Sequence, residues 1–281
     1  MDYAFLRWPG FLDKAFTLSY DDGVASDRRF VGLINEYGAK CTFNLNSALF
    51  GNNNFKPHVS EDEVKDLYIE NGHEVATHGK NHYVLTAVPK EVAIDEIISD
   101  RKFLENLLQT PVCGHAYPNG LYDDAVVETL KQCGIVYART IEKTHDFSIP
   151  TDWLRLAPTC PHRDPELLNL ADAFLKGPKY DHRFLSKPLL FYVWGHTYEF
   201  DDYDNWNVME ELLQKVGKRD DVWYCTNMQV YRYVKAYEQL EFSADGSMIY
   251  NPTSTDLYLR YFGKNVLVKA GQTVNFGDIT K

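Results

Sequence analysis

The sequence predicts an α/β protein whose core is a parallel β barrel. Short apolar runs alternate with stretches of helical periodicity along most of the 281 residues, a pattern typical of parallel strands connected by helices. Acidic and histidine side chains follow several apolar runs, and barrel enzymes carry their active sites at the carboxyl ends of strands. We expect strands at residues 15–19, 41–45, 74–77, 112–116, 136–139, 189–194 and 223–226. Helical periodicity, often opened by Ser, Asp or Pro, covers residues 27–37, 60–71, 89–108, 123–133, 165–176 and 205–216.

A change of pattern near residue 240 divides the chain. With 44% hydrophobic residues, residues 1–240 can bury one large core and are expected to form the barrel. Beyond them, short alternating runs are punctuated by Gly and Asn-Pro, which predicts a small antiparallel β appendage. We expect residues 241–281 to pack on the barrel, because a segment of this length is a poor independent domain.

Composition excludes two classes of partner. A net charge of −11 argues against nucleic acid, whose binding depends on clustered Lys and Arg. The chain has no run approaching the ~18 apolar residues of a membrane span and no signal-peptide pattern at its start, so we expect no membrane partner and a cytoplasmic protein, unless a leader was trimmed. Five cysteines without a Cys-x-x-Cys pair favour reduced thiols. The sequence does not indicate the oligomeric state.

Two adjacent carboxylates, Asp21 and Asp22, follow the first long strand and precede Gly23. Neighbouring side chains of a regular strand point to opposite faces, so the pair converges on one site only if the strand breaks there. Gly23 permits that break. One carboxylate can then bind a metal while the other stays free.

A histidine pair downstream supplies further ligands. His78 and His82 are four residues apart, which places them on one face of a helical turn or within reach on a compact loop. Together with Asp22 they make a typical set for a catalytic divalent ion, with one coordination position left for water. A lone His-x-x-x-His is weak support, and the two acids upstream strengthen it.

Four segments in order resemble one known family. Residues 17–23 and 78–82 are similar to the first two motifs of the polysaccharide deacetylase family (NodB homology, carbohydrate esterase 4). Residues 116–120 resemble the third motif in a variant form, and residues 193–196 resemble the last. The resemblance spans roughly residues 13–240. It implies a distorted (β/α)7 TIM-like barrel, to which the small C-terminal antiparallel β appendage is added.

The resemblance implies a metal-dependent hydrolase that removes N-acetyl groups from an N-acetylated sugar, oligosaccharide or polysaccharide. Asp22, His78 and His82 would hold the ion, with Zn²⁺ expected and Co²⁺ or Ni²⁺ as alternatives. Asp21 would be the general base. His196 would be the general acid that protonates the departing amine.

Further positions follow from the same resemblance. Tyr117 and Trp194 are expected at the substrate, with the backbone N–H of Tyr117 helping to stabilise the oxyanion. The segment at Asp152 resembles the end of the fourth motif, so Asp152 is expected to orient His196. Asp146 is the alternative.

The chain also departs from the family pattern. The third motif usually begins with an arginine that tethers the base carboxylate, and this chain has His115 or Ala116 there. Arg139 is a candidate replacement, and a solvated arginine at a strand end is an equal alternative. Gly79 stands where Ser or Thr is common, which alters a hydrogen bond behind the metal ligands.

Several other residues remain open. Glu199 could orient an imidazole or simply begin a surface loop. His162, in a loop rich in Pro and Cys, could overhang the site. We expect His58, His145 and His182 to face solvent, because no motif surrounds them.

Two alternative functions remain. The first is an amidohydrolase of the same fold that acts on a non-sugar amide or cyclic imide. The second is a catalytically weak sugar-binding protein that kept the metal. The presence of Asp21 and His196 counts against the second, because a binding protein needs neither a base nor an acid beside the metal.

Overall fold

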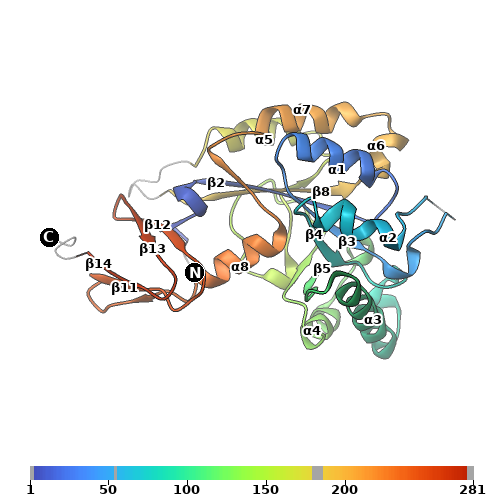
Figure 1. Cartoon of the computed structure of the whole chain (residues 1–281), viewed down its shortest axis with the longest axis horizontal. Helices are drawn as coiled ribbons and strands as arrows, with labels where there is room; N and C mark the ends of the chain where they lie inside the picture. The colour runs from blue at the N-terminus through green and yellow to red at the C-terminus, as the bar shows by residue number, and fades with distance from the viewer. Residues whose placement is uncertain (1–2, 54–55, 179–185, 277–281) are drawn as a thin grey trace.

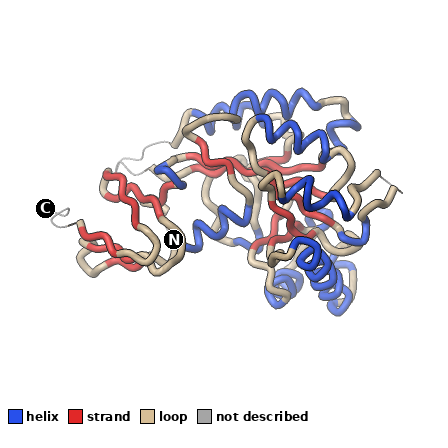
Figure 2. The backbone as a smooth tube through the Cα atoms, in the orientation of Figure 1, coloured by secondary structure: helices blue, strands red, loops and turns tan. Residues whose placement is uncertain are grey.

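A parallel sheet forms the centre of the protein in our computed structural model, which describes residues 3–53, 56–178 and 186–276 (Figures 1 and 2). Its strands within those ranges are β2 (Lys14–Asp21), β3 (Cys41–Leu45), β4 (Glu74–Thr77), β5 (Gly114–Ala116), β6 (Tyr137–Arg139), β7 (Cys160–Pro161), β8 (Leu189–His196) and β9 (Val222–Tyr224). Seven strands run in the order β6-β5-β4-β3-β2-β8-β7, and β9 pairs with the start of β2. All of these pairings are parallel. The expected distorted α/β barrel is confirmed.

Helices cover the sheet. They are α1 (Asp27–Glu36), α2 (Glu61–Val64, continued by a π-helical turn), α3 (Lys90–Leu108), α4 (Asp124–Gln132), α5 (Leu167–Leu175), α6 (Tyr198–Asp202), α7 (Trp206–Val216) and α8 (Asn227–Tyr237). Figure 1 shows α1, α5 and α7 on one side of the sheet and α3 and α4 on the other. No helix in the described ranges is both long and apolar enough to span a bilayer.

The side chains of β2 alternate between the hydrophobic core, which lies between the sheet and its helices, and the inside of the barrel. Phe16, Leu18 and Tyr20 are fully buried in the apolar cluster that contains residues of α1, α5 and α7. Between them, Thr17 and Ser19 are buried and point to the opposite face, the barrel interior. The polar interior prepares a buried environment for Asp21, the last residue of the strand.

Before residue 240, the sequence pattern missed two strands and two α-helices. Two are the two-residue strands β1 (Leu6–Arg7) and β7, and two are helices α6 and α8. Residues 223–226 were expected to be a strand, but β9 ends at Tyr224. Thr226 instead caps α8, forming a capping box with Gln229, a signal that the sequence does contain.

One segment joins the two edges of the sheet, β6 and β7. Leu156 forms a parallel bridge with Arg139 at the end of β6, and four residues later Cys160 pairs with Val193 of β8. Residues 156–161 therefore connect the two sides of the barrel. This connection fixes Arg139 at the same rim as the ends of β2 and β8.

The appendage consists of two antiparallel sheets. One contains β1, β12 (Leu257–Tyr261) and β13 (Lys264–Val268), and the other contains β10 (Glu241–Phe242), β11 (Met248–Tyr250) and β14 (Thr273–Asn275). Leu6 pairs with Leu259, so an N-terminal strand is part of the appendage. A boundary at residue 240 did not anticipate this pairing, and residues 277–281 of the expected appendage lie outside the described ranges.

Trp8 connects the appendage to the barrel. Its side chain is fully buried, and its indole Nε1–H donates to the backbone oxygen of Leu189 at the start of β8, at 3.0 Å. The ring also lies against Trp223 and Tyr233, with centroids 5.4 and 5.9 Å away. The Tyr233 hydroxyl donates to the backbone oxygen of Arg7 at 2.7 Å.

We predict that Trp8→Ala lowers the free energy of unfolding by about 3–5 kcal/mol, because it leaves a large cavity at this junction. Urea unfolding followed by circular dichroism measures the change. Tyr83→Ala is the control, since Tyr83 is 47% exposed and should change stability by less than about 0.5 kcal/mol. Equal effects of the two substitutions would contradict the prediction.

Candidate active site

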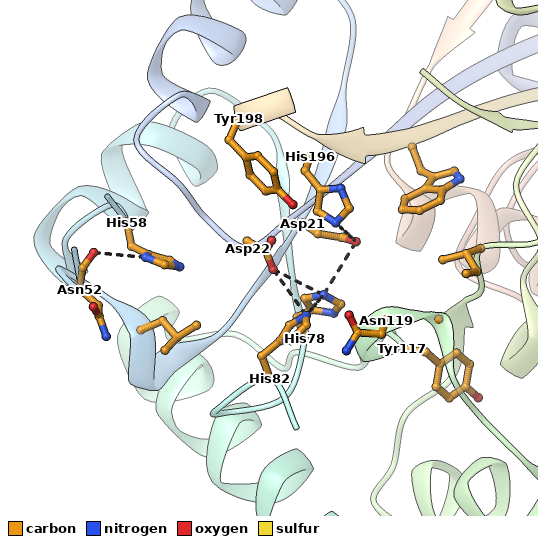
Figure 3. Close-up of a pocket in the computed structure, with 14 residues that line it drawn as sticks. Asp21, Asp22, Asn52, His58, His78, His82, Tyr117, Asn119, His196 and Tyr198 are labelled. Atoms are coloured by element: carbon orange, nitrogen blue, oxygen red, sulfur yellow. Dashed lines mark hydrogen bonds and ion pairs between the residues drawn. The ribbon is translucent and has the colours of Figure 1, made fainter. Parts of the chain in front are cut away.

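A cavity of about 600 Å³ opens at the carboxyl ends of the barrel strands. Figure 3 shows the side chains that line it. Seven of the eight residues expected at the site are among them: Asp21, Asp22, His78, His82, Tyr117, Trp194 and His196. Asp152 is the exception.

Asp22, His78 and His82 form a possible metal site. One ligand atom from each lies within 4.8 Å of the others. The Nε2 atoms of the two histidines are 3.2 Å apart, and each is 3.7 Å from Oδ1 of Asp22 (Figure 3). Two imidazole nitrogens and a carboxylate oxygen suit a divalent ion such as zinc or cobalt.

The environment of His78 prepares it to bind a metal. Its Nδ1 lies 2.8 Å from the backbone oxygen of Ala116, which can only accept, so Nδ1 carries the proton and the Nε2 lone pair faces the cluster. Burial lowers the pKa of His78 to about 4. The ring is therefore neutral near pH 7, which is the form that binds metals.

A left-handed turn separates the two aspartates. Asp22 and Gly23 have φ values of 78° and 65°, so the strand breaks at Asp22 itself, one residue earlier than the glycine suggested. Positive φ is uncommon for residues other than glycine and concentrates at functional sites. His82 also has a positive φ, of 61°. Two of the three possible ligands thus occupy unusual backbone positions.

Two carboxylates of α3 hold the histidine loop from behind. Glu96 accepts a hydrogen bond from the backbone N–H of Asn81 at 2.8 Å. Asp100 accepts from the backbone N–H groups of Ser47 and His78, at 2.9 and 3.3 Å. Gly79 has a φ of 77°, a backbone conformation that other residues rarely adopt, which gives a conformational reason for glycine at that position.

Arg139 supplies the tether that the third motif lacks. Its Nη2 donates to Asp21 Oδ2, and the side chains of Arg139 and Asp21 are 1% and 2% exposed. Asn44 Nδ2 donates to the other carboxylate oxygen at 2.8 Å. Burial raises the pKa of Asp21, but the charge of Arg139 foremost, then those of His78 and His196, lower it to about 2. Asp21 is therefore ionised at neutral pH.

His196 lies between two carboxylates. Its Nε2 is 3.8 Å from Asp21 Oδ2, and its Nδ1 is 3.4 Å from Glu199 Oε2. Desolvation lowers the pKa of His196, but Glu199 and then Asp21 outweigh it and raise the pKa above its usual value. Arg163 contacts Glu199 from outside at 3.0 Å.

The structure corrects the expectation that Asp152 orients His196. Asp152 caps a short turn by accepting from the N–H of Leu154 at 3.1 Å, and its other oxygen pairs with Arg155 at 2.8 Å. The alternative, Asp146, accepts from Ser148 N at 2.7 Å within its own loop. The carboxylate beside His196 is Glu199, at the spacing i, i+3.

Tyr117 also differs from expectation. Its backbone N–H donates to the backbone oxygen of Arg139 at 3.1 Å, so it is already bonded and not free for an oxyanion. Its hydroxyl donates to Leu154 O at 2.7 Å and points away from the cavity (Figure 3). Asn119 lines the same cavity with φ 55°, and within the described residues its backbone N–H has no recorded acceptor.

The remaining histidines divide between core, surface and cavity. His162 is buried against Tyr20 and does not line the cavity, and a Cβ on Gly195 would overlap its ring. His145 pairs with Asp164 at 2.9 Å. His58 was expected to face solvent but lines the cavity. No sequence signal marked it, because tertiary contacts bring it there. His182 lies outside the described residues.

Comparison with known families confirms the resemblance that the motifs indicated. Residues 11–138 match the sequence model of the family described as polysaccharide deacetylase. This segment contains the first three motifs, including Asp21, Asp22, His78 and His82. The resemblance to the polysaccharide deacetylase family is thus shown on the part of the chain that holds the possible metal ligands.

Among curated proteins, the chain is similar to the peptidoglycan-N-acetylglucosamine deacetylase of Bacillus cereus, at 26% identity over 143 residues. That match covers 50% of this chain and 61% of the relative, less than two thirds of its length.

Two solved structures share the fold. A candidate polysaccharide deacetylase from Mycobacterium smegmatis has a TM-score of 0.59 at 15% identity, with 85% of this chain and 96% of that chain covered. A family 4 acetyl xylan esterase from Clostridium thermocellum, in complex with a cobalt ion, has a TM-score of 0.52 at 12% identity, with 78% and 91% covered. At these identities the two structures support the fold alone.

We predict that Arg139→Met lowers the free energy of unfolding by about 3–5 kcal/mol, because it leaves the Asp21 carboxylate buried without its partner. Urea unfolding at pH 7 measures the loss. The double variant Asp21→Asn/Arg139→Met should recover most of it, since removing both members of a buried pair is often nearly neutral. A loss below about 1 kcal/mol in the single variant would show that Asp21 does not depend on Arg139.

Proposed function

We propose that this protein is a metal-dependent hydrolase that removes acetyl groups from an N-acetylated sugar, oligosaccharide or polysaccharide. The observation that carries the proposal is the pairing of an ionised carboxylate, Asp21, with a histidine of raised pKa, His196, in one cavity beside three possible metal ligands. A base and an acid next to a metal are what amide hydrolysis requires. The curated relative, whose name gives N-acetylglucosamine as its substrate, supports an N-acetylated sugar.

We propose Asp22, His78 and His82 as the metal ligands, with zinc as the ion and cobalt or nickel as alternatives that share these donors. When bound, such an ion polarises a carbonyl group and lowers the pKa of a water molecule.

Asp21 acts as the general base in this proposal. It accepts the proton of the water that attacks the acetyl carbonyl carbon. Arg139 and Asn44 each bind one of its oxygens, so the carboxylate is held in one orientation before substrate arrives. Such preorganisation removes the need for rearrangement during the reaction.

His196 acts as the general acid. Its raised pKa favours the protonated ring near neutral pH, and the proton passes to the nitrogen of the departing amino sugar. Glu199 contacts Nδ1, which keeps the ring in place and leaves Nε2 on the side of Asp21 and the cavity. Glu199 is thus a positioning residue in the role first expected of Asp152.

The backbone N–H of Asn119 is the proposed donor to the oxyanion that develops on the acetyl oxygen, in place of that of Tyr117. It belongs to a residue of the cavity wall and has no recorded acceptor in the described part of the chain. A donor to a developing oxyanion contributes about 3–4 kcal/mol where the loss of a side-chain donor has been measured.

The direct test is acetate release from N-acetylglucosamine oligomers, and from O-acetylated sugars beside them, by protein loaded with zinc, cobalt or nickel. We expect N-deacetylation that stops when the metal is chelated and resumes on its return. Asp21→Asn should retain metal and lose about 10²–10⁴-fold in kcat.

The other outcomes of this test would each favour a different function. Bound metal without acetate from any sugar would contradict the proposed function and favour a non-sugar amide substrate or a binding protein. Release from O-acetyl sugars alone would assign an esterase.

We predict that Glu199→Gln moves the alkaline limb of the kcat profile to lower pH by about one unit or more. The carboxylate raises the pKa of His196 in the native protein, so without it the acid loses its proton at a lower pH. Asp152→Asn should leave the profile in place, because Asp152 contacts Leu154 and Arg155 instead. A shift with Asp152→Asn and none with Glu199→Gln would reverse the assignment.

A further inference from the structure

We propose that His58 is a substrate-binding residue whose Nε2 accepts a hydrogen bond from a hydroxyl group of the sugar that carries the acetyl group. This inference rests on the proposed function and names the side chain that recognises the sugar rather than the acetyl group. His58 lies in the long connection between β3 and α2, outside the motifs that identified the site.

Backbone hydrogen bonds fix His58 beside the turn that holds Asp22. The N–H of Ala25 donates to Pro57 O at 2.7 Å, and the N–H of Val59 donates to Gly23 O at 2.9 Å. His58 itself forms an antiparallel bridge with Val24. The position of His58 relative to the metal ligands is therefore set by the fold and not by a free loop.

The ring of His58 is oriented from behind. Both its backbone N–H and its Nδ1 lie within hydrogen-bond distance of the backbone oxygen of Asn52, at 2.9 and 3.2 Å. A carbonyl oxygen can only accept, so Nδ1 carries the proton and Nε2 of the neutral ring is an acceptor. Within the described residues no partner for Nε2 is recorded, and Figure 3 shows the ring extending from Asn52 toward Asp22.

The side of the cavity on which His58 lies indicates which group of the substrate donates a hydrogen bond to its Nε2. Figure 3 places His58 and Tyr117 on opposite sides of the Asp22–His78–His82 cluster. The acetyl group must lie at Asp21 and His196, where the reaction occurs. A group that reaches His58 then belongs to the remainder of the substrate, and on a sugar the donors there are hydroxyl groups. An acceptor aimed at that position discriminates against an analogue that lacks the hydroxyl.

The experiment compares His58→Phe and His58→Gln. Phenylalanine keeps a ring of similar size but has no acceptor, whereas the glutamine amide oxygen can accept. For the best N-acetylated sugar of the panel, we expect His58→Phe to raise KM about fivefold, the effect of one hydrogen bond, with kcat nearly unchanged. His58→Gln should recover part of the loss. The dissociation constant of the same sugar, measured by calorimetry in Asp21→Asn protein loaded with zinc, should rise by the same factor in His58→Phe.

Deoxy analogues of that sugar sharpen the test. The wild-type protein should bind one monodeoxy analogue more weakly than the parent sugar, and His58→Phe should bind the two equally. His145→Phe is the control, because His145 lies outside the cavity. Hydrolysis of 4-nitrophenyl acetate, which has no hydroxyl group, should be the same in His145→Phe as in the wild-type protein.

Two results overturn the inference, and they differ. If wild type deacetylates sugars and His58→Phe leaves both KM and the dissociation constant unchanged, His58 is only a rim residue and the proposed function stands. If wild type releases no acetate from any sugar, the proposed function fails and this inference fails with it.

Discussion

The buried ion pair between Asp21 and Arg139 is the constraint on which the site depends. It joins residues 118 positions apart, one at the end of β2 and one at the end of β6, and both side chains are almost completely shielded from water. Burying two charges is costly unless the geometry is good and the remaining polar atoms are bonded. Here Asn44 binds the second oxygen of Asp21, and the guanidinium lies 4.4 Å from the ring centroid of Trp194. The barrel must therefore be complete before the carboxylate is in place.

The same ion pair explains why the adjacent residues Asp21 and Asp22 have different environments. Asp21 ends a regular strand, points into the barrel and is held by Arg139 and Asn44. Asp22 begins the left-handed turn, its side chain is 19% exposed, and it points toward His78 and His82. One peptide bond thus divides a buried, fully paired carboxylate from an accessible one with room for an ion. The difference comes from backbone direction and not from residue type, since the two side chains are chemically identical.

The local pattern of apolar and polar residues was enough to predict most of the fold, because the periodicity of each segment indicates a strand or a helix and the sequence gives the order of these elements. It also brought Asp21, Asp22, His78 and His82 to one proposed site, through a strand end and a fixed spacing, whereas His196 came from the resemblance to the family's last motif; all five line the same cavity. It was not enough for contacts made between segments. Arg139 reaches Asp21 from the strand next to the third motif, and only the folded sheet distinguishes it from a surface arginine. Glu199 had a local signal in its i, i+3 spacing from His196, and the competing acid at 152 obscured it.

The position of β2 has a consequence for how the chain reaches this fold. β2 pairs with β3 nearby in sequence and with β8 along its whole length, yet β8 begins about 170 residues after β2 ends. At a synthesis rate of about 5–20 residues per second, that interval is roughly 10 to 30 s on the ribosome. During it the central strand has one unpaired edge, and such edges are templates for aggregation. The nascent chain is therefore most prone to aggregation at β2, the strand that lies at the centre of the finished sheet. It stays so until β8, the strand that ends in His196, has emerged.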